Sequence, residues 1–358
     1  DFAHRTFHWS NEGRNNAAVH CVIIGFSKAG KGPFHLFDYP DIKGEPHRFE
    51  AKTINPYLID FENILIQKRS RHLCDVPELK IGNKPIDDGN YIFTDEEKEA
   101  FLGLPDNAKV RAEVEALMHP FIGSQEFLNG GIRWILKLQD VEPHVLKRMP
   151  EVLKRIESVK RFRERSTDAG TRALAATPRR FHVENFPTGS FLVVPKVSSE
   201  RRAYVPMGFS DDKGHTLFSD LVFIGRDATL YHFGVLSSAM HMAWVRTVGG
   251  RLESRYRYSS GIVYNTFPWP DSPNENQHKA IEEAAQAVLD TRAAHPGSSL
   301  ADLYDPDAMP PDLAKAHQKL DKAVDTAYAA EAGQKTWESD LERAKFLFRL
   351  YKDLTAGS

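Results

Sequence analysis

The sequence predicts a mixed α+β protein, on the basis of three changes in pattern along its 358 residues. Residues 1–60 contain short alternating or continuous apolar runs, which are typical of strands. Residues 61–270 combine apolar residues at helical spacing with short β-type runs broken by Gly, Pro and Asp. Residues 271–358 are rich in Ala, Lys and Asp at helical spacing, which predicts a C-terminal helical bundle.

The composition indicates a soluble globular protein with more than one core. Hydrophobic residues make up 41% of the chain and charged residues 27%, and the length allows two or three domains. Cys21 and Cys74 are too few and too far apart for a disulfide framework, which favours the cytoplasm. No apolar run approaches the length of about 18 residues that a membrane span needs, so we expect no membrane partner.

The N-terminal segment is expected to be the end of a larger sheet. Phe2–Trp9 alternates aromatic and polar residues, and Ala17–Phe26 is a nearly continuous apolar run, which predicts a strand covered on both faces. Two strands cannot form a domain alone, so we expect the rest of the sheet upstream. The first residues also lack the features of a signal peptide, and we interpret the chain as part of a longer protein. The loop between the strands contains Asn11, Gly13, Asn15 and Asn16.

Helix and strand signals are mixed through the middle of the chain. Thr94–Glu97 is a capping-box signature at a helix start. Apolar residues at steps of three and four predict one helix from about Pro143 to Arg165, and a buried helix from Tyr231 to Val248. Short runs predict strands at FLVVP (191–195), AYVPMGF (203–209), DLVFIG (220–225) and GIVYNTF (261–267).

Charge distinguishes the middle of the chain from its end. Lys147 to Arg180 contains eleven Lys and Arg against four Asp and Glu, whereas residues 271–358 contain ten against sixteen. The basic middle predicts a polyanionic partner, for which duplex DNA is our first candidate.

Two basic segments supply candidate phosphate contacts, because Lys, Arg and hydroxyl groups bind phosphates without reading sequence. One lies on the predicted helix that ends near Arg165, and the other precedes the predicted strand 203–209. The alternatives are a solvated helix face with pairs such as Glu157 with Arg161, and a plain surface loop with a pair between Glu200 and an Arg. The candidates are Lys160, Arg161, Arg163, Arg165, Ser198, Ser199, Arg201 and Arg202.

Residues 250–260 (GRLESRYRYSS) are the best candidate for reading bases. Their strict alternation predicts one strand with Glu253, Arg255 and Arg257 on the same face. Arg donates two hydrogen bonds to guanine, and a carboxylate accepts from the exocyclic amine of cytosine. Residues two apart on a strand are about 6.5 Å apart, so Glu253 and Arg255 could read one C·G pair. The alternative is an exposed strand whose charges pair with each other. Asp220 is a further candidate for base contact.

No complete catalytic, cofactor-binding or metal-binding motif is found in the sequence. Ile54–Tyr57 (INPY) is one proline short of the Asn-Pro-Pro-Tyr motif of amino-methyltransferases, and it follows the strand pair instead of preceding it. His232 and His241 lack partners at zinc spacing, and no Gly-rich phosphate loop is present. We therefore expect no catalytic residue, metal or cofactor within this chain.

Seven segments together resemble one family, the MmeI-like type II restriction–modification enzymes, whose methyltransferase and nuclease share one polypeptide. The resemblance is to the C-terminal half of these enzymes, which related stand-alone DNA methyltransferases share, and it extends in order over nearly the whole chain. The segments are NNAAVHCVIIGFS (15–27), GNKPIDDGNYIFT (82–94), PKVSSERRAYVPMGF (195–209), HFGVLSSAMHMAWVR (232–246), GRLESRYRYSS (250–260), VYNTFPWP (263–270) and LADLYDPDAMPPDLAKAHQKLDKAVDTAY (300–328).

The resemblance implies three parts. Residues 1–60 would be the last strands of a Rossmann-like methyltransferase fold, residues 61–270 a target recognition domain, and residues 271–358 a C-terminal helical domain. It also implies an upstream core that binds S-adenosylmethionine. Family members vary at the positions matching Glu253 and Arg255, including a Lys/Asp pair of opposite sign, as residues that set specificity should.

We therefore expect this chain to recognise duplex DNA for an adenine-specific DNA methyltransferase, and to be inactive alone. Two alternatives remain at this point. The chain could be a separate specificity subunit that acts in trans, or an interaction or scaffold domain without a role in nucleic-acid binding.

Overall fold

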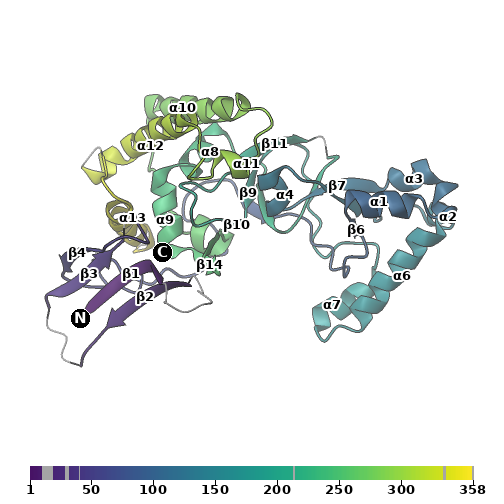
Figure 1. The fold of residues 1–358 in the computed structure, drawn as a ribbon, viewed down its shortest axis with the longest axis horizontal. Helices are drawn as coiled ribbons and strands as arrows, with labels where there is room; N and C mark the ends of the chain where they lie inside the picture. The colour runs from purple at the N-terminus through teal and green to yellow at the C-terminus, as the bar shows by residue number, and fades with distance from the viewer. Residues whose placement is uncertain (10–18, 29–31, 40, 213, 334–335, 357–358) are drawn as a thin grey trace.

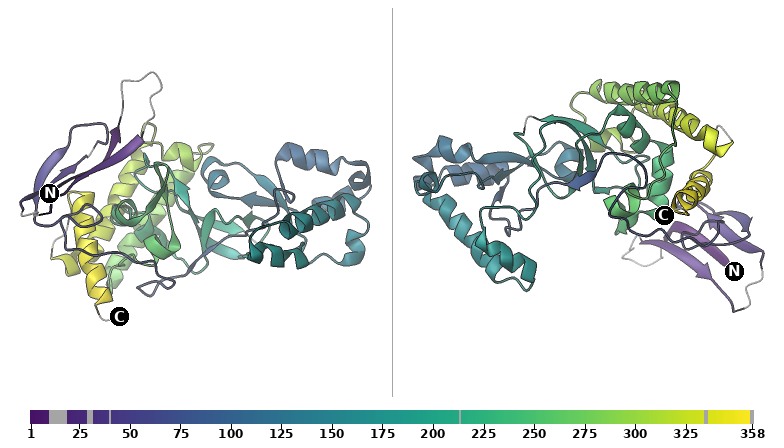
Figure 2. Two further views of the ribbon diagram at one scale, coloured as in Figure 1. Left: turned by 90° about the horizontal axis from the view of Figure 1, so that it is seen from below. Right: turned by 180° about the vertical axis from the view of Figure 1, so that it is seen from behind.

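The fold is a chain of small sheets and helices that runs between two ends, in a computed structural model that describes residues 1–9, 19–28, 32–39, 41–212, 214–333 and 336–356. An N-terminal sheet forms one end, and an arm containing helices α1–α3, α6 and α7 forms the other (Figure 1). The central sheets and the C-terminal helices lie between them, as the views from below and from behind also show (Figure 2). The predicted mixed α/β class with C-terminal helices is confirmed.

The N-terminal sheet has the strand order β2–β1–β3–β4. The expected pair β1 (Phe2–Trp9) and β2 (Val19–Gly25) is antiparallel, whereas β3 (Phe34–Asp38) runs parallel to β1. Strand β4 (His47–Ala51) is antiparallel to β3. The sequence analysis missed β3 and β4, since both are short and mix polar with apolar residues.

Strand β2 is not covered on both faces, contrary to the prediction. Val22 is 50% exposed, Ile24 56% and Phe26, just after the strand, 87%. The small core of Ala3, Leu36 and Ala51 lies over the other strands and includes no residue of β2. The predicted loop residues Asn11, Gly13, Asn15 and Asn16 lie outside the described residues.

The central body is built on an antiparallel sheet with the order β11–β9–β13–β5, which buries the apolar run of its central strand β9. The four strands are β5 (Leu79–Ile81), β9 (Gly189–Pro195), β11 (Gly208–Asp212) and β13 (Val222–Gly225). Two helices replace the single helix predicted over 231–248: α8 (Leu230–Leu236) and α9 (Ala239–Val248). The break follows from Ser238, whose hydroxyl caps α9 by accepting from His241 N at 3.3 Å.

A second small sheet, with the order β10–β15–β14, lies against this body. Its strands are β10 (Val197–Ser198), β14 (Gly250–Leu252) and β15 (Arg255–Arg257), so residues 250–257 form a hairpin and not the single strand predicted. The predicted strand 261–267 is instead a short π-helix, Ser260–Tyr264. Its residues are apolar and mostly buried, and periodicity alone does not separate such a helix from a buried strand.

The arm has its own sheet, β12–β7–β8–β6, and its own core around Tyr91, Phe93 and Val159. The predicted capping box is confirmed, since Thr94 Oγ1 accepts from Glu97 N at 3.2 Å. The helix predicted over 143–165 is interrupted before Pro150, because a proline disfavours helical backbone at the residue that precedes it, here Met149. The elements are β6 (Ile92–Phe93), β7 (Met118–Ile122), β8 (Arg133–Leu136), β12 (Leu217–Phe218), α1 (Asp95–Leu102), α2 (Pro105–Ala108), α3 (Arg111–Glu115), α5 (Pro143–Leu146), α6 (Pro150–Glu164) and α7 (Ala169–Ala173). Helix α4 (Ser124–Asn129), which follows β7, packs on strand β9 of the central body.

The C-terminal helices share one hydrophobic core with the central body. Helix α10 packs on α8 and α12, and α13 packs on α9. The segment after β4 joins the same core, since the rings of Tyr57 and Phe348 are 5.2 Å apart. The helices are α10 (Glu275–Ala293), α11 (Leu300–Leu303), α12 (Pro311–Ala332) and α13 (Asp340–Thr355).

Candidate DNA interface

The predicted base-reading residues lie at the tip and on one strand of the β14–β15 hairpin. Leu252 pairs with Arg255, so Glu253 and Ser254 form a two-residue turn. Glu253 has a φ of 58°, and two-residue hairpin turns need a positive φ at this position. That conformation is unfavourable for a side chain such as Glu, and strained residues of this kind cluster at functional sites. Glu253 therefore projects from a turn, which corrects its prediction as a strand residue.

The predicted alternation is confirmed on β15. Arg255 and Arg257 are exposed, whereas Tyr256 and Tyr258 are buried. The side chains of Glu253 and Arg255 are 76% and 45% exposed, and Glu253 Oε2 accepts from Arg255 Nη2 at 2.7 Å. Ion pairs this exposed contribute little to stability, so both groups can exchange their mutual contact for base edges at small cost.

Both inward tyrosines of this strand are anchored to helix α9. The hydroxyl of Tyr258 lies 2.9 Å from His241 Nε2, and the hydroxyl of Tyr256 accepts from Arg246 Nε at 3.2 Å. Burial lowers the pKa of His241 to about 3, so its imidazole is neutral and serves in the core, as expected for a histidine without metal partners. The exposed face of the strand is thus held from behind by a buried helix.

The serine and arginine loop after β10 lies beside the hairpin, because Ser198 pairs with Tyr256 across the sheet. Ser198 is only 3% exposed, so its placement contradicts the predicted phosphate contact. Ser199 Oγ accepts from Arg201 N at 3.2 Å, and the half-buried Arg202 donates to Ser198 Oγ at 3.4 Å. The guanidinium of Arg201 is paired with Asp307, in the turn between helices α11 and α12.

Asp220 lies close enough to Lys196 to act on its charge. Burial lowers the pKa of Lys196, the carboxylate of Asp220 opposes that shift, and the charges of Lys84 and Arg257 add to it. The amine of Lys196 is 4.8 Å from the centre of the Phe223 ring. Lys196 lies beside the hairpin, since its carbonyl accepts from Tyr258 N at 2.8 Å. The sequence analysis did not select it, although it lies two residues before Ser198.

Arg163 is a core residue and not a phosphate contact, which corrects the prediction. It is fully buried, and its five guanidinium hydrogen bonds all go to backbone carbonyls. The acceptor residue nearest to Arg163 in sequence is 11 residues away, and the farthest is 78 residues away. Arg163 therefore connects segments of the arm that are distant in sequence. The acceptors are Pro85 O, Ile86 O, Leu174 O, Thr177 O and Arg180 O.

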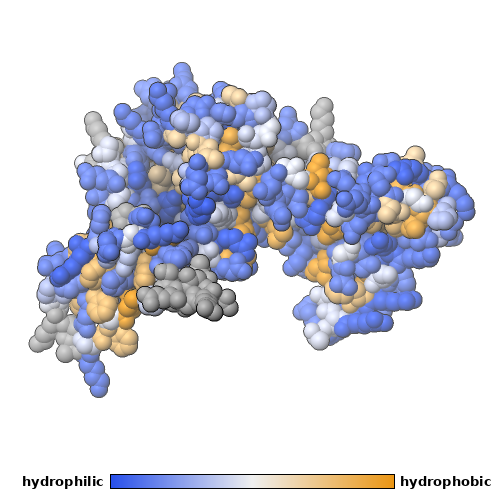
Figure 3. Space-filling model, in the orientation of Figure 1, coloured by the Kyte–Doolittle hydropathy of each residue, from blue (hydrophilic) through white to orange (hydrophobic). Residues whose placement is uncertain are grey.

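The other predicted cations of α6 lie on its surface. Arg161 pairs with Glu157 at 2.9 Å, and Lys160 lies 3.9 Å from Glu164, as in the solvated-face alternative. Arg165 is exposed at the end of the helix. In the space-filling view, the surface is hollowed below the central body, between the arm and the N-terminal sheet (Figure 3). Strand β14 lies at the body's edge facing this hollow (Figure 1).

The discounted motifs have structural roles. Asn55 is buried, and its side-chain oxygen accepts from Tyr57 N at 3.0 Å and Ile59 N at 3.2 Å, so it builds a turn. Within the described ranges, no group of three or more His, Cys, Asp or Glu residues is placed to hold a metal ion. No described helix is long and apolar enough to cross a membrane.

Three family models match the chain in succession. The DNA-methyltransferase domain of MmeI matches residues 1–38, its target recognition domain residues 60–271, and its C-terminal domain residues 273–357. Residues 60–271, which include the hairpin, thus form a target recognition domain that follows part of a DNA-methyltransferase domain. The chain belongs to the MmeI family.

Two relatives agree with this assignment. DNA methyltransferase A of Bacillus subtilis (strain 168) is 41% identical over 362 residues, which cover 99% of this chain and 38% of the relative. The solved structure of the Type IIL restriction–modification enzyme MmeI in complex with DNA is 46% identical, with a TM-score of 0.88 over 99% of this chain and 46% of MmeI. The chain therefore spans less than half of the length of either relative.

Proposed function

We propose that this chain reads a short sequence in duplex DNA for a DNA methyltransferase that modifies the exocyclic amine of adenine. The observation that carries the proposal is the exposed pair of Glu253 and Arg255, 2.7 Å apart at the tip of a hairpin. A carboxylate and a guanidinium side by side match the cytosine amine and the guanine acceptors of one base pair. The solved structure of the relative MmeI is a complex with DNA, which supports DNA as the partner of this chain.

Further contacts follow from position and exposure. Arg257 shares the outward face of β15 with Arg255, so we keep it as a base-contact candidate. We also keep Asp220, because Asp220 and Arg257 are both close enough to Lys196 to affect its pKa. As candidates for phosphate contact we retain the exposed cations of helix α6 and the residues of the loop beside the hairpin. Arg163 and Ser198 are left out because they are buried. The retained candidates are Lys160, Arg161, Arg165, Ser199, Arg201 and Arg202.

The methyl-transfer step belongs to the rest of the proposed enzyme. The DNA-methyltransferase relatives imply S-adenosylmethionine as its cofactor. We place its binding site in the rest of the proposed enzyme, because the described part of residues 1–38 contains strands without a Gly-rich turn leading into a helix. We place the domain boundaries near residues 60 and 270, and we assign no catalytic residue to this chain.

The proposal is tested by DNA binding at two salt concentrations and by selection from a pool of random-sequence duplexes. We expect binding that weakens as salt rises, because phosphate contacts release counterions, and a single enriched motif. A scaffold domain would bind no duplex, and binding without salt dependence would contradict the electrostatic part. A reading frame that continues upstream into an Asn-Pro-Pro-Tyr motif would exclude a separate subunit acting in trans.

A further inference from the structure

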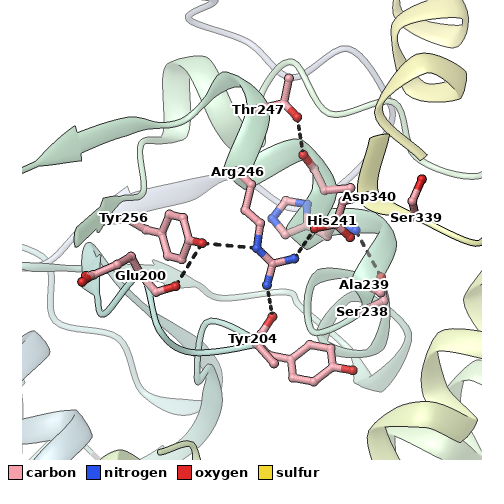
Figure 4. A network of polar contacts seen from close by, with 12 residues as sticks. Glu200, Tyr204, Ser238, Ala239, His241, Arg246, Thr247, Tyr256, Ser339 and Asp340 are labelled. Atoms are coloured by element: carbon pink, nitrogen blue, oxygen red, sulfur yellow. Dashed lines mark hydrogen bonds and ion pairs between the residues drawn. The ribbon is translucent and has the colours of Figure 1, made fainter. Parts of the chain in front are cut away.

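One guanidinium beneath the hairpin joins three segments that are far apart in sequence (Figure 4). Arg246, near the end of α9, donates from Nη1 to Asp340 Oδ2 at 2.5 Å and from Nη2 to Ala203 O at 2.7 Å. Its Nε donates to the hydroxyl of Tyr256 at 3.2 Å. Helix α13, the loop after β10 and strand β15 therefore meet at Arg246.

Tyr256 transmits this arrangement to the hairpin. Its hydroxyl donates to Glu200 O at 3.2 Å, so one phenol connects the strand, the serine and arginine loop, and Arg246. On the other strand, the guanidinium of Arg251 lies 4.1 Å from the centre of the Tyr256 ring. The ring is thus contacted from the neighbouring strand β14, and its hydroxyl is bonded to Arg246 and to Glu200 O.

The outer strand of the hairpin, β14, is the edge strand of its sheet and has little packing of its own. All three residues of β14 are exposed, and the turn contains the strained Glu253. Strand β15 is held at one edge by two residue pairs with β10, and from below by the buried rings of Tyr256 and Tyr258. Hydrogen bonds to base edges tolerate only small errors in distance and angle. The height and tilt of β15 therefore depend on what its inward side chains contact.

We propose that Arg246, held in place by Asp340, is a positioning residue for sequence discrimination. The pair sets the orientation of the hairpin so that Glu253 and Arg255 reach base edges together, although neither Arg246 nor Asp340 touches DNA. The inference rests on the proposed function. It assigns to helix α13, in the C-terminal domain, a direct part in specificity through a single ion pair.

The test is Asp340→Asn in the full-length protein, with duplexes from the random-pool selection as probes. The readout is a discrimination ratio, the affinity for the selected duplex divided by the affinity for the same duplex with one base pair changed. The changed base pair is the one at which Arg255→Ala reduces the sequence preference. We expect Asp340→Asn to lower this ratio about tenfold, the scale of one lost base contact. Affinity for random duplex should stay nearly unchanged, because phosphate contacts dominate it. Asp340→Glu should restore the ratio.

A matched control separates positioning from general loosening. Asp325 forms an ion pair with Arg343 at 2.8 Å, between α12 and α13, which is more buried than the pair of Arg246 and Asp340. Among the described residues, neither Asp325 nor Arg343 has a hydrogen bond or ion pair to the hairpin. Asp325→Asn should leave the discrimination ratio unchanged. In an Arg255→Ala background, Asp340→Asn should cause no further loss of discrimination, because its effect acts through the hairpin.

Three outcomes would overturn the inference. Asp340→Asn could leave the ratio unchanged, it could weaken binding to selected and random duplexes equally, or Asp325→Asn could lower the ratio as much. A wild-type protein that enriches no motif would contradict the proposed function itself, and this inference with it. Tyr256→Phe, which keeps the ring and removes only the hydroxyl, tests the same connection if the change at Asp340 prevents folding.

Discussion

Helix α6 and the β14–β15 hairpin are the two arginine-rich elements of the target recognition domain, and they use their guanidinium groups in opposite ways. In α6, Arg163 donates only to backbone carbonyls inside the arm, and Arg161 pairs along its own helix. In the hairpin, Arg255 and Arg257 face outward while the two tyrosines between and after them carry the strand's packing. A count of basic residues therefore does not identify a nucleic-acid surface, because the same side chain can serve as a core crosslink.

The largest expected effect is on the arm's stability. Arg163→Ala leaves five backbone carbonyls without their donor, and buried unsatisfied acceptors are costly. We expect the free energy of unfolding to fall by about 3 kcal/mol or more, measured by urea denaturation. Arg165→Ala, two residues away and exposed, is the control and should change it by less than about 0.5 kcal/mol. Equal effects of the two changes would refute the assignment of Arg163 to the core.

At the hairpin, the expected effect is on specificity. Exchanging Glu253→Lys together with Arg255→Asp reverses the donor and acceptor pattern, so the preference at one position should change from C·G to G·C. Each base contact is worth about 1–3 kcal/mol of discrimination. Methylation mapping with the complete enzyme, or selection from the random pool, measures the change. A double variant that still prefers the original site, with the original affinity, would show that this pair does not read bases.

The body behind the hairpin should respond to pH. Asp321 on α12 accepts from Tyr204 Oη at 2.6 Å and from Ala239 N at 2.6 Å, and its burial raises its pKa to about 6. A carboxyl with a raised pKa stabilises the fold when protonated, and this contribution is lost as pH rises from the unfolded pKa of about 3.9 through the folded value.

Between pH 4 and pH 7, the wild type should therefore lose about 1–3 kcal/mol of unfolding free energy relative to Asp321→Asn, whose amide does not titrate. Urea denaturation at the two pH values measures it. A difference that stays constant with pH would mean that Asp321 titrates normally.

The smallest expected effect is on the arm's surface cations. If Arg165 contacts a phosphate, Arg165→Ala should weaken binding to all sequences alike and reduce the slope of log affinity against log salt by about 0.9. Titrations with selected and random duplexes measure both slopes. An unchanged slope would show that Arg165 contacts no phosphate, and would leave the residues around the hairpin as the proposed DNA interface.

The accuracy of the sequence analysis depended on how local each signal was. The capping box at Thr94 and the outward and inward alternation of β15 were predictable, because each is set by residues within a few positions of one another. The role of Arg246 was missed, although a single cation directly after segment 233–245, which contains no Lys, Arg, Asp or Glu, was a usable signal. Its partners lie 43 and 94 residues away, and periodicity carries no information on such contacts.

By itself, the sequence determined the mixed class, the helical tail, the basic middle and the family, since composition and motifs do not depend on how distant segments meet. The tertiary structure alone decided that Glu253 occupies a turn, that Arg163 and Ser198 are buried, and that a C-terminal aspartate supports the hairpin. The physical reason is that exposure and hydrogen-bond partners are set by long-range packing. A side chain's chemistry limits what it can bind, and the fold determines what lies within its reach.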